Sequence, residues 1–513
     1  MGNTSFIQLA EIFQDGMVLQ RNQPIRLFGS TESHQQISVT INGAQICEAE
    51  LDAGTFQIEL PAQEAAENVT LQLKNVEGEV ITFRDVDIGE VWIAGGQSNM
   101  EFPLLCDRDG DAVIANANDE HLRYYEVGKY AFEGEREENL KNGSRWNNWR
   151  KFIPDECTHF SAIGTYFARE LREKLGVPVA VVGCSWGGTS ASAWIDEAIL
   201  RQDPELRVYT DTYDKAVSKL NLEKYTKNDY KYRSFMGTEK NVLGAEATMK
   251  NEVTAPMKFP MKQIAKLLQL TLRPGPHSEN RPGGLYQTML SKITGYSAKG
   301  VIWYQGENDE HHAELYARLF TKTVECWRRD WKVELPFLFV QLAPWEQWMA
   351  SDGRNFPTLR DQQQTVEDTV PGMYMASIMD VGSQYDIHPK VKKPVGERLA
   401  LLAADEIYGM KQTFAHAPRI TKAERNGKKV VVSFAYAEGG LKAKGSIDSL
   451  FNLSQNGKTL PVSAKVVDNT VVLTCEALTA EKATLSFAYA PFLVMNLFNQ
   501  GDLPARPAAP MDI

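Results

Sequence analysis

The sequence predicts an α/β protein built on a parallel sheet, with a smaller β-domain on either side. In the middle of the chain, apolar strand-like runs alternate with helical patterns, which is typical of a parallel sheet covered on both faces. Before and after this region, apolar and polar residues alternate with a period of two, as in strands with one buried face. The length of 513 residues also favours several domains over one core. We therefore expect an N-terminal β-domain over 1–88, a central α/β domain over 89–412 and a C-terminal β-domain over 413–513.

The two outer regions have the patterning of sandwiches. Residues 36–41, 55–60 and 69–73 alternate near the N-terminus, and residues 429–434, 471–474 and 483–489 alternate near the C-terminus. Turn residues separate these runs, as expected for two packed antiparallel sheets.

The central region contains the expected parallel strands and their helices. Apolar runs over 86–94, 177–182, 300–304, 336–342 and 373–378 predict five strands. Apolar residues at helical spacing predict helices over 160–175, 314–327 and 394–407. Residues from about 203 to 280 are rich in Lys, Tyr, Asn and Glu, and we expect a helical or irregular insertion there, at the mouth of the site.

Composition excludes some classes of function. The formal net charge of −11 argues against binding to nucleic acid or to anionic membrane surfaces. No apolar run approaches the roughly 20 residues that span a bilayer. The six cysteines are scattered without a C-x-x-C pair, which favours free, mostly buried thiols; Cys106 and Cys157 are the one pair that flanks an insertion. Residues 1–5 are polar and lack the apolar core of a signal peptide, so the protein is either cytoplasmic or has had a signal removed.

A serine follows the first central strand. The segment Gly-Gly-Gln-Ser-Asn-Met over 95–100 ends the apolar run 91–94. The glycines permit a tight turn, and the carboxyl ends of strands in open α/β sheets are where active sites lie. Ser98 is therefore a candidate nucleophile, although an isolated segment of this kind is more often a polar turn. Ser185 is a weaker candidate, and Cys184 lies within an apolar strand end.

Three other strand ends carry polar segments at the same predicted edge. His388 lies after the last strand, with Asp386 two residues away, and could activate a serine. Glu307 offers a second carboxylate after the strand 300–304, and neighbouring side-chain amides could donate to an oxyanion. The glycine cluster over 183–189 follows the second strand, and its N–H groups could complete an oxyanion hole.

We expect neither a metal nor a cofactor. His311 and His312 are adjacent, so on a helix they would point about 100° apart and would not share one metal. His121 and His159 are the remaining candidates, and no phosphate-binding G-x-x-x-x-G-K-[ST] segment is present.

Taken together, these motifs resemble those of the SGNH hydrolases and, more closely, the sialate O-acetylesterase family. The four blocks of the SGNH pattern correspond to residues 96–100, 186–188, 306–309 and 386–389. Three further segments resemble the sialate esterases in particular, and they lie at 15–21, 282–286 and 303–307. The resemblance covers nearly the whole chain and implies a flavodoxin-like, three-layer SGNH domain between two β-domains.

The resemblance also implies a serine esterase that removes acetyl groups from sialic acid or a related acetylated sugar. Ser98 would attack the acetyl carbonyl and His388 would accept its proton. The supporting carboxylate is either Asp386 or Glu307, because the SGNH pattern places an acid three residues before the histidine, where this chain has Tyr385. The residues expected to hold the oxyanion are Ser98, Gly187 or Gly188, and the amide of Asn308 or Gln305. The residues expected to contact the substrate are Gln97, Asn99, Trp186 and Tyr286.

Two alternatives remain open. An esterase with the same mechanism could act on acetylated plant polysaccharide such as xylan, because specificity depends on rim loops. A catalytically dead glycan-binding protein is less favoured, because both a nucleophile and a base are present. Family habit favours a secreted or periplasmic location, with a cytoplasmic one still open, and the sequence does not indicate an oligomeric state.

Overall fold

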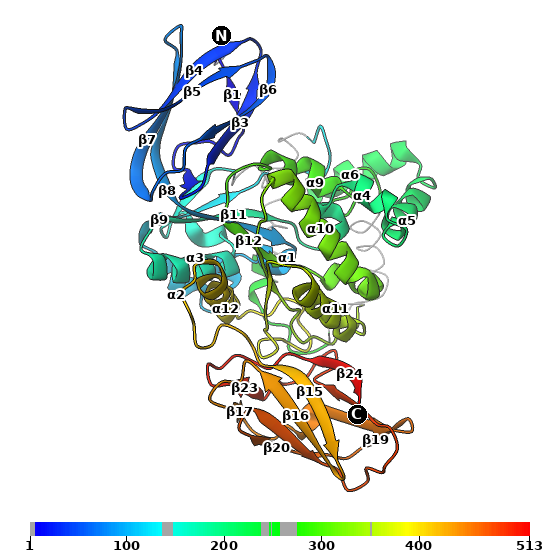
Figure 1. Ribbon diagram of the computed structural model, residues 1–513. Helices are drawn as coiled ribbons and strands as arrows, with labels where there is room; N and C mark the ends of the chain where they lie inside the picture. Colours follow the sequence, from blue (N-terminus) through cyan, green and yellow to red (C-terminus); the bar gives the residue numbers. More distant parts are fainter. Residues whose placement is uncertain (1–5, 136–146, 237–245, 248, 257–273, 349–350) are drawn as a thin grey trace.

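The computed structural model describes residues 6–135, 147–236, 246–247, 249–256, 274–348 and 351–513. Three regions follow one another along the molecule, with an N-terminal β-region at one end, an α/β region in the middle and a C-terminal β-region at the other end (Figure 1). All six cysteines are free thiols and five of them are buried, which confirms that expectation. Among the described helices, none has both the length and the apolar character needed to cross a bilayer.

The N-terminal region is a sandwich of two sheets. One sheet has the order β1-β3-β6, and in the other β4 pairs with β5 and β7. Buried side chains alternate along these strands, as with Ile37, Val39 and Ile41 on β4, so each sheet turns one apolar face inward. The strands are β1 (Gln8–Leu9), β2 (Val18–Gln20), β3 (Ile25–Thr31), β4 (Gln35–Ile41), β5 (Ala44–Leu51), β6 (Gly54–Leu60) and β7 (Ala66–Asn75).

One long strand joins this region to the central sheet. β8 (Val80–Gly96) pairs antiparallel with β7 along its first half and parallel with β11 and β12 along its second half. β2 also pairs with it, in parallel, where the two halves meet. The strand runs through residue 88, the expected domain boundary, and the buried side chains of the N-terminal and central regions form one continuous core.

The central sheet has the order β9-β11-β8-β12-β13-β14, and neighbouring strands of this set are parallel, while β10 adds to the β9 edge in antiparallel orientation. Taken without β9, the five remaining parallel strands have the flavodoxin order 2-1-3-4-5. Successive strands are added on one side of β8 and then on the other, so the strand order reverses between β8 and β12. Ligands of such sheets bind at that reversal, outside the carboxyl ends of the strands. The strands are β9 (Asp119–Glu126), β10 (Trp149–Phe152), β11 (Val179–Ser185), β12 (Gly300–Tyr304), β13 (Phe337–Val340) and β14 (Met373–Ala376).

Helices pack on both faces of this sheet. Trp92 of β8 meets Phe167 of α3 at a ring distance of 5.1 Å, and Trp303 of β12 meets Trp327 of α10 at 5.7 Å. Trp92 is paired in register with Gly300, three residues before Trp303, so the two tryptophans point to opposite faces. α12 packs on α3, and α11 packs on α10. These four helices are α3 (Ala162–Leu175), α10 (Tyr316–Trp331), α11 (Phe356–Thr369) and α12 (Lys393–Leu402), the last continued by a π-helical turn (Ala403–Ile407).

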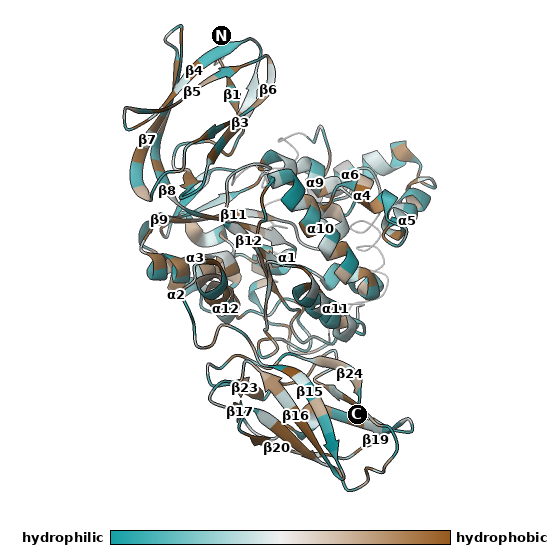
Figure 2. Cartoon of the chain, in the orientation of Figure 1, coloured by the Kyte–Doolittle hydropathy of each residue, from teal (hydrophilic) through white to brown (hydrophobic). Residues whose placement is uncertain are grey.

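The remaining helices surround the sheet edge and the expected insertion. α5 and α6 occupy the first part of residues 203–280, so this part is helical; residues 237–245, 248 and 257–273 lie outside the described residues. Figure 2 shows the contrast between the apolar strands of the central sheet and the polar outer surfaces of the helices. These helices are α1 (Ser98–Glu101), α2 (Gly110–Ala115), α4 (Glu197–Gln202), α5 (Arg207–Val217), α6 (Leu222–Met236) and α9 (Gly284–Thr288); 3₁₀ turns cover 104–106, 157–159, 191–194, 290–292, 307–315 and 448–450.

The C-terminal region has its own apolar core, between a four-stranded sheet β15-β16-β21-β20 and a second sheet β19-β18-β22-β24. Phe434 and Phe487 join the two sheets at a ring distance of 5.7 Å. The buried Arg360 of α11 fixes this region by donating to the carbonyls of Ala490 and Pro491, each at 2.8 Å. The strands are β15 (Arg419–Asn426), β16 (Lys429–Ala435), β17 (Leu441–Ala443), β18 (Phe451–Gln455), β19 (Lys458–Leu460), β20 (Ser463–Val467), β21 (Thr470–Thr474), β22 (Thr484–Phe487), β23 (Leu497–Asn499) and β24 (Ala508–Asp512).

Candidate active site

The turn after β8 presents Ser98 at the carboxyl edge of the sheet. Gly96 has a φ of 129°, and a Cβ placed on it would clash with the carbonyl oxygen of Tyr304 on β12. Only glycine fits this close approach at that backbone angle. The chain then enters α1 at Ser98, and the side chain of Gln97 does not cap this helix. The first N–H groups of α1 therefore lack a side-chain acceptor from the cap position.

Ser98 lies against a histidine that is distant from it in the sequence. The Oγ of Ser98 is 2.8 Å from Nε2 of His388, which lies in the loop after β14. The rings of Phe102 and Trp348 lie 6.5 and 5.7 Å from the imidazole ring. Burial lowers the pKa of His388 below its usual value, and the nearby positive charge of Lys392 adds to this effect. The imidazole is thus neutral at neutral pH and can accept a proton from the serine.

Asp386 supports the loop that carries His388. Its Oδ1 accepts a hydrogen bond from the backbone N–H of His388 at 2.9 Å. Its Oδ2 lies 3.0 Å from Nζ of Lys390 and accepts from the backbone N–H of Val253, within the expected insertion, at 3.2 Å. The carboxylate therefore contacts the backbone of the base, and Nδ1 of His388 has no hydrogen-bond partner among the described residues. The negative charge of Asp386 raises the pKa of His388, but burial has the larger effect and lowers it.

Glu307 lies behind Ser98 and is connected to it through Asn99. Nδ2 of Asn99 donates to Oε1 of Glu307 at 2.6 Å and to the carbonyl oxygen of Ile387 at 3.0 Å. The other carboxylate oxygen of Glu307 is buried without a partner among the described residues. Burial raises the pKa of Glu307 to about 7. The second candidate carboxylate thus reaches the serine helix and the histidine loop through the Asn99 amide.

The glycine segment after β11 lies against the serine. A Cβ on Gly187 would lie 3.2 Å from Cβ of Ser98, so the absence of a side chain allows this approach. The N–H of Gly187 donates to Oε2 of Glu101 at 2.6 Å. Gly188 has a φ of 73°, and its carbonyl accepts from Nδ2 of Asn280 at 2.5 Å. A loop at the end of β11 is therefore fixed beside Ser98 from two sides.

The two candidate oxyanion amides have different surroundings. Gln305 is fully buried, and its Nε2 donates to Oδ2 of Asp309 at 2.6 Å and to the carbonyl of Thr189 at 3.1 Å. Asn308 is exposed, and its Nδ2 lies 3.2 Å from Oδ1 of Asn280, beside the glycine segment. The amide of Gln305 is already committed to the protein interior, whereas that of Asn308 lies at the surface.

The four residues expected to contact the substrate differ in burial and in position. Gln97 is buried, and its Oε1 accepts from the backbone N–H of Asn308 at 3.3 Å, so Gln97 and Asn99 are held inside the protein. Trp186 is half-buried next to the glycine segment. The hydroxyl of Tyr286 donates to Asp330 at 2.8 Å, in the last turn of α10, which leads to the opposite edge of the sheet. Trp186 therefore lies next to Gly187, the residue that approaches Ser98, whereas the hydroxyl of Tyr286 is held by α10.

Sequence reasoning assigned no role to three residues of this site, namely Trp348, Lys392 and Asp309, although Asp309 lies in the block 306–309. Trp348 follows β13, so the rule that selected the other strand ends could have found it. Asp309 is buried and accepts from Oγ of Ser190 at 2.5 Å, which joins the ends of β11 and β12. Lys392 donates from Nζ to Oδ1 of Asn99 at 2.6 Å, and a lysine next to a helix start gave no signal of burial.

Of the histidines considered for metal binding, His311 and His312 lie in the 3₁₀ turn 307–315 after β12, and the other two pair with carboxylates. His121 pairs with Asp87 at 2.9 Å and His159 with Glu246 at 3.1 Å. Within the described ranges, one group of three residues could hold an ion, and it consists of Asp405, Glu406 and His416. That group lies where α12 meets the C-terminal region, and Nε2 of His416 is 2.8 Å from Glu406, the spacing of an ordinary ion pair.

Comparison with known proteins shows which proteins this chain resembles. Residues 275–404 match the family described as "Carbohydrate esterase, sialic acid-specific acetylesterase". The proteins in this class are carboxylic ester hydrolases, and the match covers the end of β12 with Glu307 and the loop with His388.

The individual relatives agree with that class. The chain is 24% identical to a mouse sialate O-acetylesterase over 69% of its length and to the human one over 80%. The alignments span 62% of the mouse and 70% of the human protein, so the chain covers less than two thirds of the mouse relative's length. A crystal structure of a carbohydrate acetylesterase from Xanthomonas citri matches with 28% identity and a TM-score of 0.74, covering 99% of each chain. The resemblance seen in the motifs is thereby confirmed.

Proposed function

We propose that this protein is a serine esterase that removes O-acetyl groups from sialic acid or a related acetylated glycan. The observation that carries the proposal is the 2.8 Å contact between Oγ of Ser98 and Nε2 of His388 at the carboxyl edge of the sheet. A serine hydroxyl needs an adjacent base to react at neutral pH, and a buried, neutral imidazole is such a base. The flavodoxin strand order supports an SGNH-type, three-layer domain around this pair.

The reaction proceeds through an acetyl-enzyme. Oγ of Ser98 attacks the acetyl carbonyl carbon while Nε2 of His388 takes the hydroxyl proton. The tetrahedral intermediate collapses, the ester C–O bond breaks, and His388 returns the proton to the departing sugar oxygen. Water then attacks the acetyl group, His388 takes one of its protons, and the proton passes back to Oγ of Ser98 as acetate leaves.

The donors for the oxyanion come from the loops beside Ser98. The N–H of Ser98 begins a helix without a side-chain cap, and the N–H of Gly188 and the exposed amide of Asn308 lie on neighbouring loops. We assign the oxyanion hole to these three groups. Gly187 fits it less well because its N–H donates to Glu101. Gln305 fits it less well because its Nε2 donates to both Asp309 and Thr189, whereas among the described residues Nδ2 of Asn308 donates to Asn280 alone.

We assign the role of supporting carboxylate to Asp386. Its charge acts directly on His388 and stabilises the imidazolium that forms when the serine proton is taken. Glu307 acts through Asn99 and is held at a raised pKa, so its charge is a weaker support.

The acetylated sugar is the expected partner, and we expect it to contact Trp186, which is half-buried beside the glycine segment with Nζ of Lys129 5.8 Å from its ring centroid. Acetylated xylan is the second candidate substrate class. A glycan of either kind agrees with a secreted or periplasmic enzyme, the location that family habit favours.

Acetate release is the measurement that tests this proposal. The purified protein is assayed on O-acetylated sialic acids and on acetylated xylo-oligosaccharides, with Ser98→Ala as the matched inactive variant. We expect faster release from the sialic acids and a loss of at least about 10⁴-fold in Ser98→Ala, as for other serine nucleophiles. Faster release from xylo-oligosaccharides selects the second substrate class. Undiminished turnover by a folded Ser98→Ala variant would refute the mechanism.

A further inference from the structure

We propose that Lys392 is a positioning residue for the Ser98–His388 pair, acting through the buried amide of Asn99 and through its own charge. The inference rests on the proposed function, because it assigns a role within the same site. Lys392 exposes only 1% of its surface and so does Asn99, and Nζ of the lysine lies 2.6 Å from Oδ1 of the amide. A buried lysine is uncommon unless it is paired.

The surroundings of Lys392 hold its ammonium in place. Nζ lies 4.5 Å from the ring centroid of Phe102, the residue that follows α1. The backbone N–H of Lys392 donates to Oδ1 of Asp107 at 2.8 Å. The lysine therefore contacts the segment that follows the nucleophile at two further points besides Asn99.

An ammonium can only donate, and this fixes the orientation of the amide. With Oδ1 of Asn99 turned to Lys392, Nδ2 points to Oε1 of Glu307 and to the carbonyl of Ile387. Ile387 immediately precedes His388, and Asn99 immediately follows Ser98. The lysine thus sets a hydrogen bond that ties the backbone of the histidine loop to the serine helix.

The charge of Lys392 also acts on the base. Lys390, Glu307, Asp107 and Asp386 face it, and His388 shares this environment. Burial lowers the pKa of Lys392 to about 7, so the lysine is positive over the more acidic range in which an imidazole takes up its proton. A neighbouring positive charge disfavours imidazolium, so the lysine keeps the base free of a proton at lower pH.

Three substitutions separate the two effects. Lys392→Gln keeps a donor for Asn99 and removes the charge, and Lys392→Arg keeps the charge. Asn99→Ala removes the amide bridge and keeps the charge. The matched control is Lys393→Gln, because Lys393 is the neighbouring lysine but is exposed and paired with Glu397 at 3.6 Å.

Two readouts are taken on folded protein, checked by thermal unfolding. The imidazole of His388 is titrated by NMR, with the signal assigned through His388→Gln, and kcat and KM for acetate release are measured against pH. In Lys392→Gln we expect the midpoint of His388 and the acidic limb of kcat/KM to move up by about one pH unit. In Asn99→Ala we expect kcat to fall about 10- to 100-fold with KM and the midpoint little changed. Lys393→Gln should match the wild type.

The outcomes test the two effects of Lys392 separately, and they also distinguish the role of Lys392 from the proposed esterase function. An unmoved His388 midpoint in folded Lys392→Gln, or a midpoint in Lys392→Arg that moves as far as in Lys392→Gln, overturns the role of the charge. Unchanged kcat in Asn99→Ala overturns the role of the amide. If the wild type releases no acetate from any acetyl ester, the proposed function fails, while the NMR titration still decides the role of Lys392.

Discussion

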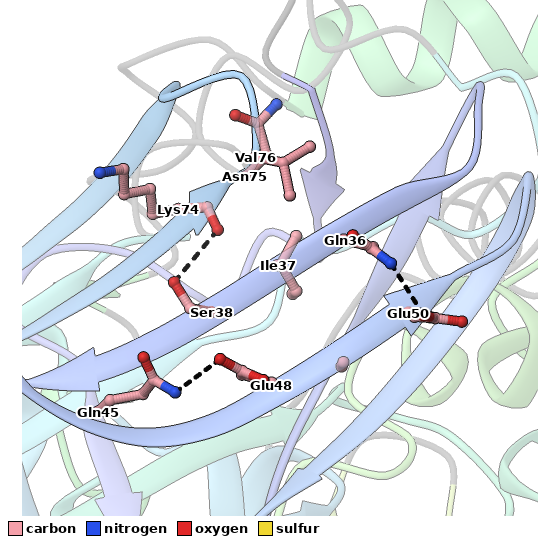
Figure 3. A pocket seen from close by; sticks show the side chains of 10 residues that line it. Gln36, Ile37, Ser38, Gln45, Glu48, Glu50, Lys74, Asn75 and Val76 are labelled. Carbon is pink, nitrogen blue, oxygen red and sulfur yellow. Dashed lines mark hydrogen bonds between the residues drawn. The ribbon is translucent and has the colours of Figure 1, made fainter.

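Two regions of this molecule carry the same kinds of side chains but use them differently. A pocket of about 640 Å³ on the N-terminal sandwich lies over β4, β5 and the end of β7, and its glutamates pair with glutamines, Glu50 with Gln36 at 2.9 Å and Glu48 with Gln45 at 2.8 Å (Figure 3). These pairs are open to water. At the strand-end site, Glu307 and Lys392 are buried, and burial moves the pKa of each to about 7. The difference in pKa arises because packing removes water from these groups, whereas water reaches the pairs in the pocket.

Two glycines show the same contrast between the site and the pocket. Of the substitutions considered, the one at the site glycine has the largest expected effect on stability and activity. Gly96 at the site and Gly78 beside the pocket both have positive φ, at 129° and 90°. A Cβ on Gly96 would clash with the Tyr304 carbonyl, whereas around Gly78 there is open space within 4 Å. We expect Gly96→Ala to cost more than about 3 kcal/mol and to abolish activity, and Gly78→Ala to cost about 1 kcal/mol. Denaturant unfolding of both variants measures this, and equal losses would show that packing does not distinguish the two regions.

The second prediction separates the two buried carboxylates. Asp386→Asn removes the charge that stabilises imidazolium, so we expect kcat to fall about 100-fold, less than the roughly 10⁴-fold seen where the acid holds the ring nitrogen. Glu307→Gln keeps an oxygen for the Asn99 amide, so we expect a fall of no more than about 10-fold.

Acetate release by both variants in one assay provides the measurement, with thermal unfolding to confirm that each is folded. A loss of several orders of magnitude in Glu307→Gln alone would make Glu307 the supporting carboxylate and would reverse our assignment.

The smallest effect is expected in the N-terminal pocket. Glu48→Gln removes a charge of the same type as that of Glu307, but from a solvent-exposed pair. We expect a change in unfolding free energy of less than about 0.5 kcal/mol and unchanged acetate release. A large loss of activity in this variant would show that the pocket takes part in handling the substrate.

Much of the site could be predicted from the sequence because strand ends carry it. Parallel strands end at one edge, so Ser98, the glycine segment, Glu307 and His388 could be brought together from their positions along the chain alone. The second half of β8 and the helices α3, α10 and α12 followed in the same way, since Val, Ile and helical spacing mark them, but the extension of β8 back to Val80, across the expected boundary at 88, was not predicted. Helix α11 went unnoticed, because its buried face includes Arg360 and Gln363, which do not read as apolar.

Side-chain direction could not be predicted in the same way. Gln97 and Gln305 lie in the motifs but point inward, because their amides satisfy buried partners that come from other loops. Tyr286 lies in a family segment, yet its hydroxyl is held by α10. Lys392 and Asp309 are buried only because distant elements close over them, which depends on tertiary packing that a local pattern does not contain.

The continuity of β8 has a consequence for how the molecule comes apart. The strand that leads to the nucleophile also forms part of the N-terminal sandwich, and one apolar core extends across both. Cooperative unfolding follows continuous packing, so these two regions should melt in a single transition. The C-terminal sandwich has a second core, to which the central region adds Met379, and we expect it to melt in a transition of its own. Removing the N-terminal sandwich would therefore cut through the strand that leads to Ser98, whereas we expect loss of the C-terminal sandwich to disturb Ser98 less.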